Sequence, residues 1–149
     1  MVQQIIRAMQ EADIEAVLFN ERHSYTYPWS QVMFEDCMMD GNDCWVMDVS
    51  GYIVGHGILS VGAEEAHLLN ICVNPDFQGN GHGRVLVEHL ISQARSQAAI
   101  CMFLEVRSSN RIAYQLYEKL GFNEVGVREN YYPAFTGRED ALVLAIELI

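Results

Sequence analysis

The stretch of residues 70–84 constrains the fold more than any other part of the chain. An apolar run leads into it, Pro75 ends the extended segment, and a helical pattern begins at about Arg84. Three glycines occupy alternate positions in between: Gly79, Gly81 and Gly83. Glycine readily adopts positive φ, and free N–H groups ahead of a helix attract anions. The stretch therefore predicts a phosphate-binding turn between a strand and a helix, with a ligand-free glycine-rich loop as the alternative.

The spacing of these glycines excludes two common nucleotide sites. A dinucleotide-binding turn carries G-x-G-x-x-G after the first strand of its unit. Here the pattern is G-x-G-x-G, and three strands that look antiparallel precede it. A P-loop requires Gly-Lys followed by Ser or Thr, whereas Gly83 is followed by Arg84 and Val85. Neither kind of nucleotide site is therefore expected in the turn.

Hydrophobic periodicity predicts groups of strands and helices along the chain. Strands are expected at residues 2–9, 44–49, 52–60, 68–73, 100–107, 122–128 and 141–148. Helices are expected to begin at Asp13, Gln31 and Arg84 and after Asn110. This order predicts a mixed sheet with helices packed on it, an α+β or layered α/β fold. A length of 149 residues fits a single domain covering 1–149.

The charge balance limits the kinds of partner. The chain has 20 acidic residues against 9 lysines and arginines, and its formal net charge is −11. Nucleic-acid binding needs a basic face, so no direct contact with nucleic acid is expected. A negative surface attracts a cationic partner, although the same charge also suits simple solubility.

Cysteine and histidine positions argue against a metal site. The four cysteines are far apart in sequence, and the five histidines form no ligand spacing with them. Widely spaced cysteines among apolar residues are typical of free thiols in a reducing compartment. The first residues lack the layout of a secretory signal, and no apolar run approaches the roughly 18 residues of a membrane span. A cytoplasmic protein without metal or membrane contact is therefore expected.

Several motifs resemble one family. Gln78-x-x-Gly81-x-Gly83 after a strand is similar to the acyl-CoA pyrophosphate loop of the GNAT superfamily of N-acetyltransferases. Residues 69–75, 104–107, 109–110, 116–122, 130–133 and 137–141, with Tyr27-Pro28-Trp29-Ser30, resemble its RimI-like members. Those enzymes acetylate the N-terminal alanine of a small-subunit ribosomal protein. The resemblance covers essentially the whole chain and implies a central mixed, mostly antiparallel sheet of about seven strands with helices on both faces.

The resemblance also implies a cosubstrate, acetyl-CoA, and the residues that would bind it. Backbone groups of one strand would pair with the pantetheine arm: Ile71, Cys72 and Val73. The following loop would wrap the pyrophosphate: Gly79, Asn80, Gly81, His82, Gly83 and Arg84. Asn110 would reach the same cosubstrate from the next helix.

Two residues are implied as catalysts, Glu105 as general base and Tyr117 as general acid. Glu105 is the one acid in an otherwise apolar strand, so it is either paired or functional. The alternative is a structural salt bridge, for example with Arg107 on the same strand face. Tyr117 lies among apolar helix positions, so its alternative is a core tyrosine. Its phenol would stay protonated at neutral pH and could donate to a leaving thiolate.

Two aromatic-proline segments are implied to line the acceptor's entry: Tyr27, Pro28 and Trp29 in one, Tyr131 and Tyr132 in the other. Their alternative is a role in covering the core. The expected partner is a protein N-terminus, of a basic ribosomal protein. Neighbouring acids could meet its basic residues: Glu35, Asp36, Glu129, Glu139 and Asp140. Two other functions stay open: acetylation of a small amine such as a polyamine or aminoglycoside, and an acyl-CoA-binding module without catalysis.

Overall fold

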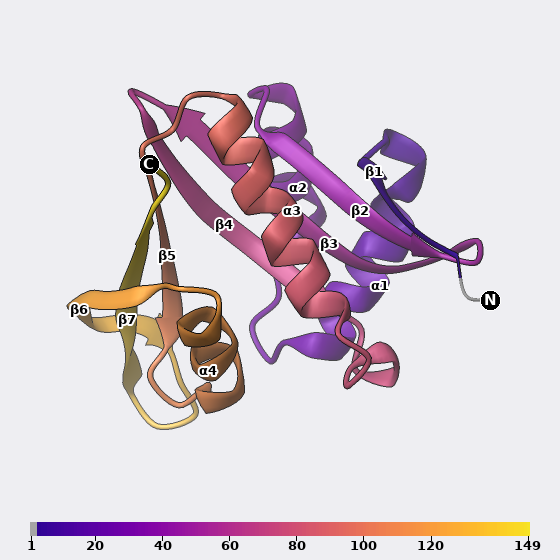
Figure 1. The fold of residues 1–149 in the computed structure, drawn as a ribbon. Coiled ribbons are helices and arrows are strands. Elements are labelled where there is room, and N and C mark those ends of the chain that lie inside the picture. The colour runs from indigo at the N-terminus through magenta and orange to yellow at the C-terminus, as the bar shows by residue number, and fades with distance from the viewer. Residues whose placement is uncertain (1–2) are drawn as a thin grey trace.

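The computed structural model describes residues 3–149 (Figure 1). Val2, expected in the first strand, lies outside the described residues. The strands are β1 (Gln4–Ala8), β2 (Asp43–Val49), β3 (Tyr52–Gly62), β4 (Glu65–Val73), β5 (Cys101–Arg107), β6 (Asn123–Pro133) and β7 (Arg138–Glu147). The helices are α1 (Ile14–Ser24), α2 (Gln31–Met39), α3 (His82–Ser96) and α4 (Arg111–Lys119), with short 3₁₀ turns η1 (Glu11–Asp13) and η2 (Pro75–Phe77).

The seven strands form one sheet in the order β1-β2-β3-β4-β5-β7-β6. Neighbours are antiparallel except β4 and β5, which run parallel. The predicted mixed, mostly antiparallel sheet of about seven strands is therefore confirmed. None of the helices between residues 3 and 149 is long and apolar enough to cross a membrane.

Helices cover both faces of the sheet (Figure 1). On one face, α1 and α2 pack over Cys44 and Val46 of β2, around the fully buried Phe34. On the other face, α3 packs over the neighbouring β2 residues Met47 and Val49. Because successive side chains of a strand point to opposite faces, one apolar strand contributes to both layers. Most of the larger core lies between α3, α4 and the central strands.

The parallel strands β4 and β5 are paired over a short length and then diverge. β4 and β5 are paired from Glu65 opposite Cys101 only as far as Leu68 opposite Leu104, and Figure 1 shows the strands diverging beyond. The register of β3 with β4 shifts at this level, which leaves Leu69 as an extra residue in β4. Such a bulge bends a strand and re-aims its side chains. The end of β4 therefore leaves its parallel neighbour while it stays paired with β3.

Two predicted boundaries are wrong in ways that affect function. The helix expected at Arg84 begins at His82, because Gly81 adopts a left-handed conformation and acts as its N-cap. The strand expected to end at residue 128 continues to Pro133 beyond an irregularity, and Tyr132 pairs with Glu139 of β7. The aromatic segment at 131–133 is thus strand rather than loop. Proline is tolerated there because β6 is the edge strand.

Candidate active site

Two clefts meet where β4 and β5 diverge. The larger has a volume of about 670 Å³ and lies between the α1–α2 segment, β5 and the ends of β6 and β7. The smaller has a volume of about 420 Å³ and lies between the end of β4, the glycine loop and α4. Six residues line both clefts: Ser24, Tyr25, Ile71, Asn110, Ala113 and Tyr117. A molecule in one cleft can therefore meet a molecule in the other.

The glycine loop forms the floor of the smaller cleft. Gly79 and Gly81 have φ of +84° and +79°, values that residues with a side chain rarely adopt. The first N–H groups of α3 lack partners within the helix, and the helix dipole adds positive potential there. At the other end of the loop, the Gln78 side chain donates to the Val73 carbonyl at 3.0 Å. The loop is therefore preorganised to bind an anion through its backbone.

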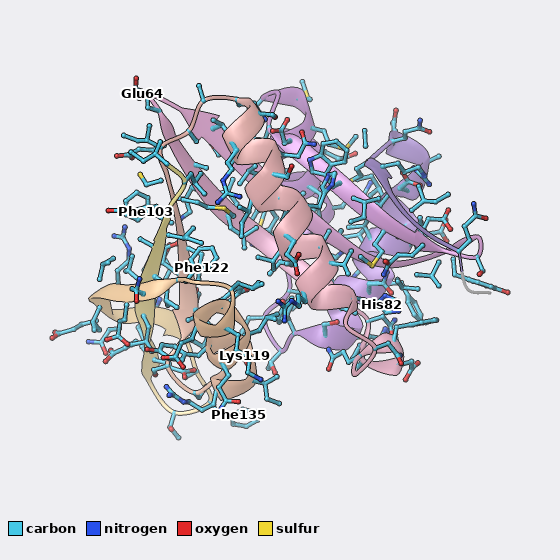
Figure 2. All side chains as sticks on the ribbon, viewed as in Figure 1. Glu64, His82, Phe103, Lys119, Phe122 and Phe135 are labelled. Atoms are coloured by element: carbon cyan, nitrogen blue, oxygen red, sulfur yellow. The ribbon has the colours of Figure 1, made fainter. Side chains whose placement is uncertain are left out.

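The side chains of this loop already have partners. Arg84 is paired with Glu88 on the next helical turn, 2.8 Å between Nε and Oε1. The ring of His82 lies 2.6 Å from the amide of Gln4 on β1, and Figure 2 shows His82 at the start of α3. An added Cβ at Gly79 or Gly81 would meet no atom within 4 Å, so open space lies beside the backbone there. An anion in this cleft would therefore bind to backbone N–H groups, because the nearby side chains of Arg84 and His82 are already paired.

Nine of the ten predicted cofactor residues line the smaller cleft: Ile71, Cys72, Val73, Gly79, Gly81, His82, Gly83, Arg84 and Asn110. Asn80 lines neither cleft. The side-chain oxygen of Asn110 accepts a hydrogen bond from the Ala113 N–H and so caps α4. The structure thus brings together the strand end, the loop and the α4 cap, although they are far apart in sequence.

Tyr25, two residues before the predicted acceptor residue Tyr27, lines both clefts. Its hydroxyl donates to the carbonyl of Ile71, on the end of β4. The residue as a whole is 37% exposed, but its hydroxyl end is desolvated at the junction of the clefts, which raises its pKa well above 10. A ligand that pairs with β4 there would meet this hydroxyl. Only the folded pairing of α1 with β4 reveals the contact.

Tyr117 stands at the junction of the two clefts. It projects from α4, is only 6% exposed, and its ring packs edge-on against Phe122. Burial, and secondarily the neighbouring Tyr132, raise its pKa well above 10. The phenol therefore keeps its proton through the neutral and moderately alkaline range. The residue lines both clefts.

Glu105 lines the larger cleft from β5, and its side chain is only 10% exposed. Its Oε2 lies 2.6 Å from Nε2 of His67, and its Oε1 lies 3.2 Å from Nε of Arg128. The suggested salt bridge with Arg107 is wrong, because that guanidinium pairs with Glu139 at 3.2 Å. The partners of Glu105 come instead from β4 and β6.

Arg107 joins the two aromatic walls of the larger cleft. Its guanidinium lies 4.5 Å from the ring centre of Tyr132 and 5.4 Å from that of Tyr27. The same group donates to the Pro133 carbonyl at 2.8 Å. Burial, and then the charge of Glu105, raise the pKa of Tyr132 to about 12. The Arg107 guanidinium, on the same strand as Glu105, therefore connects the segment between α1 and α2 to β6.

Three of the predicted acceptor residues line the larger cleft: Tyr27, Trp29 and Tyr132. Pro28 and Tyr131 do not, and Tyr131 instead packs its half-exposed ring on Tyr132 at 4.9 Å between centres. The sequence missed Phe135, which also lines this cleft from the β6–β7 turn and is 96% exposed. Figure 2 shows it projecting at the lower edge of the molecule, below α4.

A second carboxylate, Glu21 of α1, was also missed. It lines the larger cleft but is only 1% exposed. It lies 3.0 Å from Nε2 of His56, and accepts hydrogen bonds from the side chain of Asn70 and from the N–H of Trp29. A buried charge is tolerated only when it is paired in this way. The sequence signal is its position four residues after the buried Val17, on the apolar stripe of the helix.

Glu21, His56 and Cys72 bring three potential metal-ligating atoms within 4.8 Å of one another. Burial raises the pKa of the Cys72 thiol to about 12, so it is protonated at neutral pH. The thiol donates to the hydroxyl of Ser24 at 3.1 Å. The group is accounted for as a hydrogen-bonded cluster that joins α1 to β3 and β4.

Comparison with known proteins adds to this geometry. The sequence model of the acetyltransferase (GNAT) family matches residues 3–122. The chain belongs to the GNAT family of acetyltransferases. The family resemblance indicated by its motifs is thereby confirmed, and so is its class as an acetyltransferase.

Relatives of this acetyltransferase match nearly its whole length. The [ribosomal protein bS18]-alanine N-acetyltransferase of Escherichia coli (strain K12) is 38% identical over 143 residues, covering 96% of this chain and 97% of that protein. The crystal structure of the ribosomal-protein-S18-alanine N-acetyltransferase from Escherichia coli has a TM-score of 0.92 and 37% identity, covering 98% and 94% of the two chains. The sequence and structural likeness therefore point to the same RimI-like group.

Acetyltransferases of this family use acetyl-CoA. The yncA protein of Salmonella typhimurium, whose structure was solved with its cofactor acetyl-CoA, shares the fold at a TM-score of 0.81 and 20% identity, covering 99% and 95% of the two chains. The smaller cleft of this acetyltransferase has the features that such a ligand requires: a backbone cradle for phosphates and a free strand edge.

Proposed function

We propose that this acetyltransferase transfers the acetyl group of acetyl-CoA to the N-terminal α-amine of a protein, an alanine on a small-subunit ribosomal protein. The observation that carries the proposal is the joining of the two clefts at Tyr117, with Glu105 on the wall of the larger one. The names of the relatives support the choice of acceptor. The aromatic walls supported by Arg107 suit a peptide chain.

Acetyl-CoA binds in the smaller cleft. The N–H groups of the glycine loop and the first turn of α3 hold the pyrophosphate. The free edge of β4 from Ile71 to Val73 pairs with the pantetheine arm, and a backbone N–H polarises the thioester carbonyl. Asn110, at the start of α4, contacts the arm from the opposite side. This arrangement presents the acetyl group at the junction, beside Tyr117.

The peptide enters through the larger cleft, and transfer is direct in a ternary complex. Glu105 takes one proton from the α-ammonium group, and the freed nitrogen attacks the thioester carbon. As the carbon–sulfur bond breaks, the Tyr117 hydroxyl donates its proton to the departing thiolate, and the second proton that the nitrogen loses on becoming an amide restores the Tyr117 phenol. Cys72 is unsuited to a covalent intermediate because its thiol is buried and protonated at neutral pH.

An N-terminal amine suits this catalyst better than a lysine. The α-amine has a pKa of about 8, so roughly a fifth is neutral near pH 7.4, against about 0.1% for a lysine. The base therefore has little work to do on an N-terminus. The formal charge of −11 attracts a basic acceptor protein, and the proposed site of action is the cytoplasm, where ribosomal proteins are made.

Intact-mass analysis after incubation with acetyl-CoA tests the proposal. A peptide that begins Ala-Arg should gain one acetyl group, and the same peptide with a blocked α-amine should gain none. Spermidine and an aminoglycoside are offered in parallel as the competing acceptors. Turnover of a small amine with no gain on any peptide would reject the proposed acceptor. Binding of acetyl-CoA without turnover of any amine would instead support a non-catalytic module.

The role of Glu105 has its own test. Glu105→Gln removes the proton acceptor and keeps the size of the side chain. We expect kcat to fall most at low pH, where the amine is protonated and depends on a base, while the Kd of acetyl-CoA is unchanged. A wild-type pH profile in this variant would remove Glu105 as the base.

A further inference from the structure

The carboxylate of Glu105 is held from behind by a histidine. His67 on β4 is paired with Phe103 on β5, so Glu105 is its diagonal neighbour at the point where the strands diverge. Long side chains can meet across such a diagonal. Nε2 of His67 lies 2.6 Å from Oε2 of Glu105, a length typical of charge-assisted hydrogen bonds. With the carboxylate ionised, Nε2 carries the proton and donates it to Oε2.

The two residues differ in access to solvent. The Glu105 side chain is 10% exposed and lines the larger cleft. The His67 side chain is 39% exposed and lines neither cleft. The imidazole therefore supports the carboxylate from outside the cleft, where a bound peptide would not displace it.

Three other groups border this pair. Arg128 of β6 lies 3.2 Å from Oε1 of Glu105 and is 54% exposed. The charge of Glu105 helps to raise the pKa of Tyr132 on β6. The residue paired with His67 on β3 is the neutral Ser60. Among the described residues, Oε1 of Glu105 therefore contacts an exposed arginine on β6, and Oε2 contacts the histidine on β4.

We propose that His67 is a positioning residue that orients the Glu105 carboxylate toward the acceptor amine. The inference rests on the proposed function, in which Glu105 accepts the amine proton. The imidazole fixes Oε2 through one hydrogen bond and so holds the carboxylate in one orientation on the wall of the larger cleft.

The proton balance keeps His67 outside the chemical step. An N–H bond of the acceptor ammonium breaks, an O–H bond forms on Glu105, and His67 retains the proton on its Nε2. His67 therefore affects the rate only through the position of the carboxylate.

The test compares kcat with KM at pH 8, for acetyl-CoA and the Ala-Arg peptide, in two variants. His67→Ala removes the hydrogen bond to Oε2. We expect its kcat to fall at least about tenfold, because a misplaced catalytic group costs up to about 10²-fold in rate, while the peptide KM and the Kd of acetyl-CoA stay within about twofold. His67→Gln keeps a hydrogen-bond donor, so its kcat should stay within about threefold of the wild type.

His23→Ala is the matched control. This exposed histidine on α1 lines neither cleft, so its variant should keep the wild-type kcat. A wild-type kcat in His67→Ala overturns the proposal, and so does an equal loss of kcat in His67→Ala and His67→Gln. If the wild type acetylates spermidine instead of the peptide, the proposed acceptor is wrong, and the same series with spermidine still decides the role of His67.

Discussion

The two clefts that meet at Tyr117 differ in what lines them, backbone groups in one and side chains in the other. The smaller one presents mainly backbone: a strand end, two glycines at positive φ and the first turn of α3. The larger one presents side chains of α1, the α1–α2 segment, β5 and β6, joined by ion pairs and aromatic contacts. A backbone site tolerates most substitutions that leave the chain path intact. A side-chain site depends on each partner, so the two clefts should respond differently to mutation.

The largest effect is expected at the junction, which belongs to both clefts. Tyr117→Phe removes only the hydroxyl and keeps the ring that packs on Phe122. General acid catalysis contributes about 10² to 10⁴ in rate, so kcat should fall at least about 100-fold. Steady-state kinetics and calorimetry should show the Kd of acetyl-CoA and the KM of the peptide within about twofold.

Tyr114→Phe is the control for this change. It lies one turn earlier on α4, and its hydroxyl contacts Glu124 on the surface at 3.2 Å. Its kcat should match the wild type. Equal rates for Tyr117→Phe and Tyr114→Phe would show that the Tyr117 hydroxyl donates no proton in the rate-limiting step.

The contrast between the clefts also explains what could be predicted from sequence. The glycine loop was predictable because its function requires a residue type at fixed spacing, within one continuous segment. The partners of Glu105 were not, because His67 and Arg128 lie 38 and 23 positions away and meet it only through strand pairing. A period-two pattern predicts which face a side chain shares, but the register decides its neighbour.

The extent of β6 shows the same limit. Residues 131–133 combine aromatics with a proline and were interpreted as a loop. They continue the strand because Asn130 takes a positive φ of 53° and the chain then pairs again with β7. Asparagine tolerates that conformation better than most residues. The bridging Arg107 and the buried Glu21 depend on tertiary contacts in the same way, so the acceptor side of the site was the less predictable half.

The next largest effect is expected in the backbone cleft, from Gly83→Ala and Gly81→Ala. A methyl group would intrude on the approach of the pyrophosphate, so each should weaken acetyl-CoA binding about tenfold, or about 1.4 kcal/mol, and leave the peptide KM unchanged. The two variants should differ in their free energy of unfolding. Gly81 has a φ of +79°, which costs an alanine roughly 1–2 kcal/mol. Gly83 has no such φ, and its added Cβ would meet Leu116 at an ordinary 3.5 Å.

Calorimetric titration and urea unfolding separate these effects. Gly62→Ala serves as the control, because an added Cβ there meets nothing within 4 Å and the residue lines neither cleft. Wild-type affinity for acetyl-CoA in Gly83→Ala would remove this loop as the pyrophosphate site.

Glu21→Gln in the larger cleft should have a smaller effect than the glycine variants. It should weaken peptide binding rather than acetyl-CoA binding. The new amide would turn a donor toward either Asn70 or the Trp29 N–H, each of which now donates to the carboxylate. A buried group left without its hydrogen bond costs about 1–3 kcal/mol. We expect urea unfolding to report that loss, the peptide KM to rise severalfold, and the Kd of acetyl-CoA to stay constant. Glu15→Gln, exposed on the same helix, should change none of the three.

The smallest effect is expected from Glu139, which holds the end of the side-chain cleft in place. Its carboxylate accepts from the N–H of Ser109 at 2.7 Å and from Arg107 at 3.2 Å. Hydrogen bonds from Ser109, followed by those from Arg107 and Ser108, lower its pKa below the usual value. A lowered carboxyl pKa stabilises the fold above the unfolded-state value of about 4.3, and that stability is lost as the pH falls through the lowered value.

Glu139→Gln should therefore reduce the free energy of unfolding at pH 7 by less than about 1 kcal/mol, since the pair is partly exposed and screened by solvent. The difference from the wild type should shrink as the pH falls below about 4, where the wild-type carboxyl also becomes protonated. Glu129→Gln, at an exposed position on β6, should show no such dependence. A difference that stays constant from pH 7 to pH 3 would mean that Glu139 acts through packing rather than charge, and the proposed dependence of this cleft on its ion pairs would then not extend to its outer end.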